Sequence, residues 1–250
     1  MNNIVIVLVA LLLGFGAGYI GGMAGIGGGS IMTPMLILAG IEPHHAVAAS
    51  LFAIIGTSLG GLHVLLREKL FHFRHGLVVA VSSSLGALAG SLIAVNLHSK
   101  ALLYFISAAL YASAAITMLE PRAGLRSMLG RYALASGIMF AGGFISGLAG
   151  KGGGSFAVPT LMVVLGLSSK EAAATSRLVI VSNAVLADSV YILHGFFNPL
   201  IALPLVLGTY LGSTLSSKKM ITMSKEAHKR LVAGVYATMA TLVLVKTLLF

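Results

Sequence analysis

The chain has 250 residues, of which 58% are hydrophobic and only 9% are charged. A soluble domain of this size has roughly a quarter of its residues charged, so a water-soluble globular fold is excluded. Apolar runs fill the chain from end to end, which also excludes disorder and leaves an all-α polytopic membrane protein. The absence of Cys excludes disulfides and thiol chemistry. The 16 Lys and Arg against 6 Asp and Glu indicate positively charged cytoplasmic loops, not nucleic-acid binding.

The first apolar stretch lacks the basic leader of a signal peptide and is too long for one, so we expect a retained helix. Spans of about 20 residues are predicted at 46–66, 76–96, 101–119, 172–193, 200–217 and 231–249. Two further stretches, 4–40 and 132–166, are each long enough for nearly two passes and are interrupted by glycines. Because each interior glycine costs a helix about 1 kcal/mol, we expect breaks there. A short helix then begins near Ser30 and near Ser155, which are good N-cap residues.

The two halves of the chain are an internal repeat. Residues 18–34 (GYIGGMAGIGGGSIMTP) align with residues 143–159 (GFISGLAGKGGGSFAVP) at an offset of 125, with 10 of 17 positions identical. Farther along, the offset is 126, and AVAAS at 46–50 aligns with AAATS at 172–176. We therefore predict repeats at 1–120 and 121–250 within one integral transport domain. Duplicated halves with broken helices at matching positions indicate a secondary transporter.

Loop charges distinguish two arrangements of the repeats. If each glycine-broken stretch makes one pass, the repeats are parallel and the loop cations divide seven to seven between the two sides. If each makes two passes, each repeat has five segments, the repeats are inverted, and the division is twelve to two. The positive-inside rule favours the inverted arrangement. Both termini are then outside, and the predicted cytoplasmic loops are 67–75, 120–131, 167–171 and 218–230.

Residues that could bind a ligand gather at the two glycine breaks, which we expect to meet near the bilayer midplane. A glycine-rich turn leading into a helix binds anions, because free N–H groups and the positive end of the helix dipole point at the ligand. The candidate residues are Gly27, Gly28, Gly29 and Ser30 in the first half, and Lys151, Gly152, Gly153, Gly154 and Ser155 in the second. Gly14, Gly18 and Gly22 have the spacing of close helix packing instead.

A second polar set follows in the next span of each half. Ser50 and Thr57 share a helix face, and their repeat equivalents are Ser176 and Asn183. Arg177 is either a second anion-binding cation or a side chain that snorkels to the cytoplasmic interface.

Asp188 is the only carboxylate within a predicted span, and three interpretations stay open for it. It forms a structural ion pair, for which Lys151 is a candidate partner, relays a coupling proton, or lies at the lipid interface. The eight His have no ligand spacing, so we expect them to be solvated or interfacial and predict no metal and no cofactor.

The doubled glycine motif followed by Pro, and then by an Ala/Thr-Ser helix, resembles the TauE/SafE family of membrane transporters, also called sulfite exporters or toluene-sulfonate uptake permeases. The resemblance is carried by Gly18–Pro34 with Ala46–Ser50, and by Gly143–Pro159 with Ala172–Ser176. It implies a multi-pass protein of the prokaryotic inner or plasma membrane. It also implies a small inorganic or organic sulfur oxyanion (sulfite, sulfonate or sulfoacetate class) as the substrate.

The leading hypothesis is a secondary transporter for such an anion, with membrane lipid around it and a proton or cation as a coupling partner. The alternative is a passive anion channel built on the same helix dipoles. A membrane enzyme is disfavoured, because the sequence has no nucleophile–base arrangement. No oligomeric state is predicted.

Overall fold

The computed structural model describes residues 3–118 and 127–249, and the secondary structure of these residues is entirely helical. Arg122 and Arg126, which we assigned to a cytoplasmic loop, lie outside the described residues. The helices in chain order are α1 (Asn3–Ala24), α2 (Gly29–Leu38), α3 (Pro43–Gly60), α4 (Leu62–Arg67), α5 (Phe73–Ala94), α6 (Ser99–Met118), α7 (Met128–Ala149), α8 (Gly154–Val163), α9 (Ser169–Leu193), α10 (Pro199–Thr222) and α11 (Lys225–Leu249).

The predicted all-α membrane fold is confirmed. Among the described residues, five helices are long and apolar enough to cross a membrane, namely α1, α5, α7, most of α9 and the first part of α10. The apolar segments of α6 and α11 are shorter, at Ser99–Ala115 and Ala233–Leu248. The prediction of one span over 46–66 is wrong. Here α3 ends at Gly60 and the separate six-residue α4 follows, because two consecutive glycines interrupt the helix.

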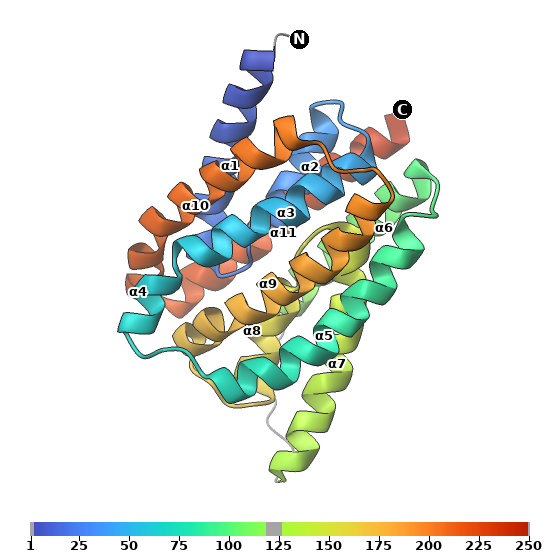
Figure 1. The fold of residues 1–250 in the computed structure, drawn as a ribbon. Helices are drawn as coiled ribbons and strands as arrows, with labels where there is room; N and C mark the ends of the chain where they lie inside the picture. Colours follow the sequence, from blue (N-terminus) through green and yellow to red (C-terminus); the bar gives the residue numbers. More distant parts are fainter. Residues whose placement is uncertain (1–2, 119–126, 250) are drawn as a thin grey trace.

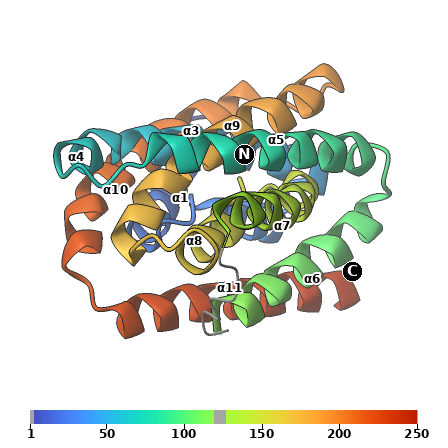
Figure 2. The ribbon, with the colours of Figure 1, turned by 90° about the horizontal axis from the view of Figure 1, so that it is seen from below.

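The helices pack in pairs that repeat between the two halves. Helix α1 packs along α10, as its counterpart α7 packs along α5, and α3 packs along α10 as α9 packs along α5. Two counterpart pairs, α3 with α9 and α6 with α11, also contact each other. Figure 2 shows α6 and α11 as a layer along one side of the molecule. In Figure 1, α1 begins at the top of the molecule and α7 begins at the bottom.

Small residues let the long helices approach closely. At Gly14, Gly18 and Gly22 of α1, an added Cβ would collide with Leu205, Thr209 and Ser213 of α10. The packing role predicted for these three glycines is therefore confirmed. The second half repeats the arrangement, since Gly143 of α7 abuts the backbone of Ser83. This contact is the repeat image of Gly18 against Thr209.

The faces turned away from these contacts carry large apolar side chains. On α1, Leu8 and Leu12 are 52% and 69% exposed, and on α10 Leu207 and Leu215 are 61% and 62% exposed. A soluble protein rarely exposes apolar patches of this extent. The outer surface of these helices is therefore suited to contact with lipid chains, and many Ser and Thr side chains are buried inside.

Both predicted glycine breaks are present, but the N-caps differ from our expectation. The N-cap of α2 is Gly28 and that of α8 is Gly153, and both are left-handed, with φ of 77° and 84°. Only glycine adopts this conformation without strain. The predicted N-cap role of Ser30 and Ser155 is therefore wrong. Each serine is the second residue of its helix, and its hydroxyl makes no capping hydrogen bond.

Candidate functional site

The two glycine turns lie against each other in the interior of the protein. A Cβ added at Gly27 would be 3.1 Å from Ile180 and 3.2 Å from Ile54, and one added at Gly152 would be 3.1 Å from both. Ile54 and Ile180 are repeat equivalents, as are the two glycines, so each turn meets the same pair of side chains. The hydroxyl of Thr33 on α2 also donates to the carbonyl of Gly150, at 3.4 Å. The starts of α2 and α8 are therefore close together, as the sequence predicted.

Two serine hydroxyls at these helix starts are buried without partners. Ser30 is 1% exposed and Ser155 is 3% exposed. Among the residues that the structure describes, neither hydroxyl has a hydrogen-bond partner. Both lie near the phenol oxygen of Tyr236 on α11, without meeting the geometry of a hydrogen bond to it. A buried polar group without a partner costs about 1–3 kcal/mol, so these groups are candidates for contact with a ligand.

Lys151 reaches the same region from the second glycine turn. Its side chain is 1% exposed, and its Nζ donates to the carbonyl of Ala109 at 2.5 Å and to Ser113 Oγ at 2.9 Å, both on α6. The ammonium also lies 5.4 Å from the centroid of the Tyr236 ring. Its amine is thus held by neutral groups of α6 and lies over the ring of the tyrosine whose phenol oxygen is near the two serines, among the residues that the structure describes.

Sequence reasoning missed Tyr236 and Ser113. Both lie in apolar spans far from the glycine motifs, where a single Tyr or Ser is ordinary. One signal was available for Tyr236. It aligns with Leu110 of the first half, and Lys151 aligns with Ile26, so the second half alone carries a polar side chain at both positions.

Two members of the predicted second polar set lie at different glycine turns, one at the start of α2 and one at the start of α8. Thr57 and Asn183, which are repeat equivalents, lie next to the N-caps Gly28 and Gly153. Asn183 Nδ2 donates to Ser83 Oγ at 2.8 Å, and its Oδ1 accepts from Ser84 at 3.1 Å.

The two serines of this set also differ. Ser176 donates to the carbonyls of Ala173 at 2.9 Å and Gly25 at 3.3 Å. In contrast, the buried hydroxyls of Ser50 and Thr57 have no partner within residues 3–118 and 127–249.

Arg177 is buried, at 3% exposure, and its contacts are with the end of α3. Its Nη1 donates to the carbonyls of Thr57 at 2.6 Å and Ser58 at 3.3 Å. The same guanidinium reaches Ser213 at 3.3 Å and Ser217 at 3.4 Å on α10. The last carbonyls of a helix have no partner inside it, so Arg177 satisfies the end of α3 from the other half of the chain. The predicted alternative, snorkelling to the interface, is wrong for this buried side chain.

Asp188 is 1% exposed, and neither of its carboxylate oxygens has a hydrogen-bond partner among the described residues. The predicted ion pair with Lys151 is therefore wrong. The physical reason is that the Lys151 ammonium turns toward α6, whereas Asp188 lies five residues before the end of α9. Placement at the lipid interface is also wrong, because the side chain is buried.

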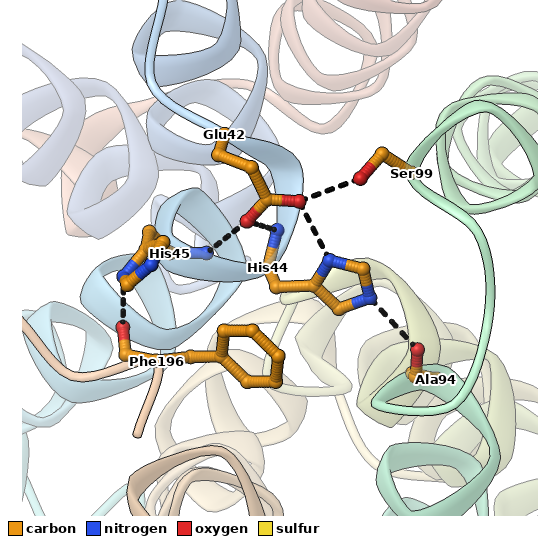
Figure 3. Close-up of polar contacts among 6 residues, drawn as sticks. All are labelled: Glu42, His44, His45, Ala94, Ser99 and Phe196. Atoms are coloured by element: carbon orange, nitrogen blue, oxygen red, sulfur yellow. Dashed lines mark hydrogen bonds and ion pairs between the residues drawn. The ribbon is translucent and has the colours of Figure 1, made fainter. Parts of the chain in front are cut away.

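A separate cluster of polar residues joins three loops at one end of the molecule (Figure 3). Glu42 accepts from the backbone N–H groups of His44 at 3.0 Å and His45 at 3.3 Å, and so caps α3. Its Oε1 also lies 2.7 Å from His44 Nδ1 and accepts from Ser99 Oγ at 2.7 Å. His45 Nδ1 lies 2.8 Å from the carbonyl of Phe196 in the loop between α9 and α10.

Within this cluster His44 is buried and the pKa of Glu42 is lowered. His44 was expected to be solvated, but it is 5% exposed, because its ring nitrogens contact Glu42 and the carbonyl of Ala94, the latter at 3.1 Å. Partial burial raises the pKa of Glu42. Contacts with His44 and the Ser99 hydroxyl outweigh that effect and hold the pKa below its usual value.

The opposite end has its own contact between the halves. His72 Nε2 lies 2.8 Å from Glu171 Oε1, and the Tyr132 hydroxyl lies 2.9 Å from His75 Nδ1. The starts of α5, α7 and α9 are therefore together at this end. The start of α3 lies at the other end, with the end of α5 and the start of α6.

Together these features define a multi-pass helical membrane protein whose buried polar groups meet at two broken helices. The sequence matches the family described as "Sulfite exporter TauE/SafE" over residues 10–243. The chain belongs to this family, which confirms the resemblance drawn from the glycine motifs.

Curated relatives cover nearly the whole chain. "Probable membrane transporter protein YdhB" of Bacillus subtilis (strain 168) is 30% identical over 230 residues, covering 90% of this chain and 93% of the relative. YunE of the same organism, also named a probable membrane transporter protein, is 26% identical, with 90% and 93% covered. YfcA of Escherichia coli (strain K12), named likewise, is 23% identical, with 94% and 87% covered. No solved structure matches the chain.

Proposed function

We propose that the protein is a secondary transporter that moves a small sulfur-containing anion, of the sulfite, sulfonate or sulfoacetate class, across the membrane by alternating access. The observation that carries the proposal is the buried Lys151 ammonium over the Tyr236 ring, together with two serine hydroxyls near the same tyrosine, at the starts of α2 and α8, which have no partner among the described residues. The sulfur chemistry comes from the family name, and the negative charge comes from the site.

The physical argument for an anion has two parts. Both short helices direct their free N–H groups and the positive ends of their dipoles toward the same region. A buried ammonium held only by neutral groups carries a desolvation cost that an anionic ligand offsets. Gly27–Gly29 and Gly152–Gly154 let the ligand approach the backbone, and Ser50, Thr57, Ser176 and Asn183 surround the turns. Arg177 contributes by fixing α3 against α9.

The proposed mechanism rests on two inverted halves, residues 1–120 and 121–250, with both termini outside. Reciprocal packing of α1 on α10 and α7 on α5 supports a twofold relation, and the opposite starting points of α1 and α7 in Figure 1 support inversion. A substrate site between two such halves is exposed to one side at a time when the halves rock about it.

Asp188 supplies the proposed coupling. It is a buried carboxylate on α9 without a hydrogen-bond partner among the described residues, so binding a proton there removes an uncompensated charge from the interior. Proton uptake and release at Asp188 would then accompany the change between the two access states.

Flux in proteoliposomes tests the assignment of Lys151. The variant Lys151→Ile places the equivalent residue of the first half, Ile26, at this position, so an apolar side chain is known to fit such a turn. We expect sulfite flux to fall at least tenfold, because one charge-assisted contact is worth about 1.5–3 kcal/mol. The matched control is Lys100→Met, which removes an exposed cation at the start of α6 and should leave flux unchanged.

The same vesicles separate a transporter from a channel. A transporter shows saturable uptake of labelled sulfite that is accelerated by unlabelled sulfite inside, whereas a passive channel shows no such counterflow. Unchanged flux in folded Lys151→Ile would remove Lys151 from the binding site. Absence of counterflow in the wild type would replace alternating access with a channel.

A further inference from the structure

The two halves of the chain pack symmetrically around the site, but they differ in the polar side chains that they contribute to it. At two positions where the first half carries the buried residues Ile26 and Leu110, the second half carries Lys151 and Tyr236. These two polar departures from the repeat are neighbours, with the Lys151 ammonium 5.4 Å from the centroid of the Tyr236 ring. Two independent changes that converge on one place indicate a single polar site next to the symmetric glycine turns.

The hydroxyl of Tyr236, like those of Ser30 and Ser155, is buried without a hydrogen-bond partner among the described residues. Tyr236 is fully buried, and its hydroxyl has no hydrogen-bond partner within the described part of the chain. Tyr191, which is equally buried, donates to the carbonyl of Gly147 at 3.1 Å. Tyr236 is therefore exceptional for a buried tyrosine in this protein.

Of the buried hydroxyls without a partner among the described residues, three from different helices lie together. Ser30 lies on α2, Ser155 on α8 and Tyr236 on α11, and the phenol oxygen lies near both serine hydroxyls. Each is a donor, and the Lys151 ammonium lies over the ring of Tyr236. This set suits an anion that presents several separate oxygen acceptors, because each hydroxyl then bonds a different oxygen.

We propose that Tyr236 is a substrate-binding residue that donates its hydroxyl to an oxygen of the transported oxyanion. The α6–α11 layer thus completes the site formed by the two glycine turns. This proposal rests on the proposed anion transport, and it names a specificity-determining residue that lies outside the glycine motifs.

Removing the hydroxyl distinguishes a role in binding from a role in the fold. We would measure the thermal unfolding midpoint of detergent-purified protein by circular dichroism, with and without sulfite, sulfate or chloride. For Tyr236→Phe we expect an unchanged or higher midpoint without ligand, because a group without a partner is removed. We expect sulfite to bind about tenfold or more weakly, seen as a smaller sulfite-induced shift. Chloride, which has no separate oxygens, should show no such loss.

Tyr191→Phe is the matched control, since it removes a buried hydroxyl that has a partner. It should lower the midpoint without ligand and leave the sulfite-induced shift unchanged. If Tyr236→Phe lowers the ligand-free midpoint as much as this control does, the hydroxyl bonds Ser30 or Ser155 internally and the proposal is overturned. An unchanged sulfite-induced shift also overturns it. A wild type that responds to none of the three anions refutes the proposed transport function itself.

Discussion

Among the residues whose burial the structure describes, three charged side chains are buried inside the helices, and they differ in what surrounds them. Arg177 has most of its donors occupied by carbonyls and hydroxyls of α3 and α10. Lys151 is held by α6, over the ring of a tyrosine whose hydroxyl has no partner among the described residues. Asp188 has no hydrogen-bond partner in the described chain. Arg177 keeps one donor, its Nε, without a partner among the described residues, but its remaining contacts join α9 to α3 and α10 and so fix the fold. The two less satisfied charges are better suited to a ligand or a proton.

Asp188→Asn tests the proposed coupling role of this carboxylate at the residue scale. The amide is nearly isosteric but cannot bind and release a proton in the transport cycle. We expect accumulation of sulfite driven by a proton gradient to fall to the level of empty liposomes, while counterflow without a gradient continues. The measurement is uptake of labelled sulfite in vesicles with and without an imposed pH difference.

The carboxylate-to-amide control for this experiment is Glu42→Gln, at the partly exposed cap of α3. It should leave the ratio of driven to undriven uptake unchanged. Gradient-driven accumulation that survives in Asp188→Asn would show that Asp188 does not carry the coupling proton.

At the scale of the helices, small residues decide which faces meet. Helix α1 places Gly14, Gly18 and Gly22 against α10, where Gly18 contacts Thr209 and Gly22 contacts Ser213. Thr209 also donates to the carbonyl of Ala53 on α3, at 2.7 Å. Because lipid chains are as apolar as the helices, close backbone contact and interhelical hydrogen bonds must supply the association. The glycine pattern therefore predicts packing partners that apolar composition alone cannot.

Gly18→Ala and Gly16→Ala form a matched pair on α1. A Cβ at Gly18 would overlap the backbone of Thr209, while one at Gly16 has nothing within 4 Å among the described residues. We expect Gly18→Ala to lower the unfolding midpoint, because overpacking costs about 1–3 kcal/mol. Gly16→Ala should leave the midpoint unchanged or raise it, because alanine favours the helix by up to about 1 kcal/mol. Equal effects of the two changes would contradict the packing of α1 on α10.

At the scale of the whole molecule, the repeat explains how much the sequence could predict. The two breaks and the short helices after them follow from glycine clusters at matching positions, and the structure has both. The separate α4 and the contact of Arg177 with the end of α3 occur in one half only, so symmetry gave no sign of them. Tyr236 was missed because a hydroxyl in an apolar helix is informative only once its neighbours are known.

The proposed inversion of the two halves is the property of the whole molecule on which the proposed alternating access depends, and the absence of Cys from the chain makes it directly measurable. Lys100 and Lys170 are both exposed at helix starts, so Lys100→Cys and Lys170→Cys each introduce a single accessible thiol. In the inverted arrangement with both termini outside, these positions lie on opposite sides of the membrane. We expect an impermeant maleimide added to spheroplasts to label Lys100→Cys at once, and to label Lys170→Cys only after permeabilisation. The parallel arrangement puts both thiols on one side, so equal labelling in intact spheroplasts would rule out inversion. The reverse pattern would keep inversion but place the termini in the cytoplasm, against the positive-inside rule.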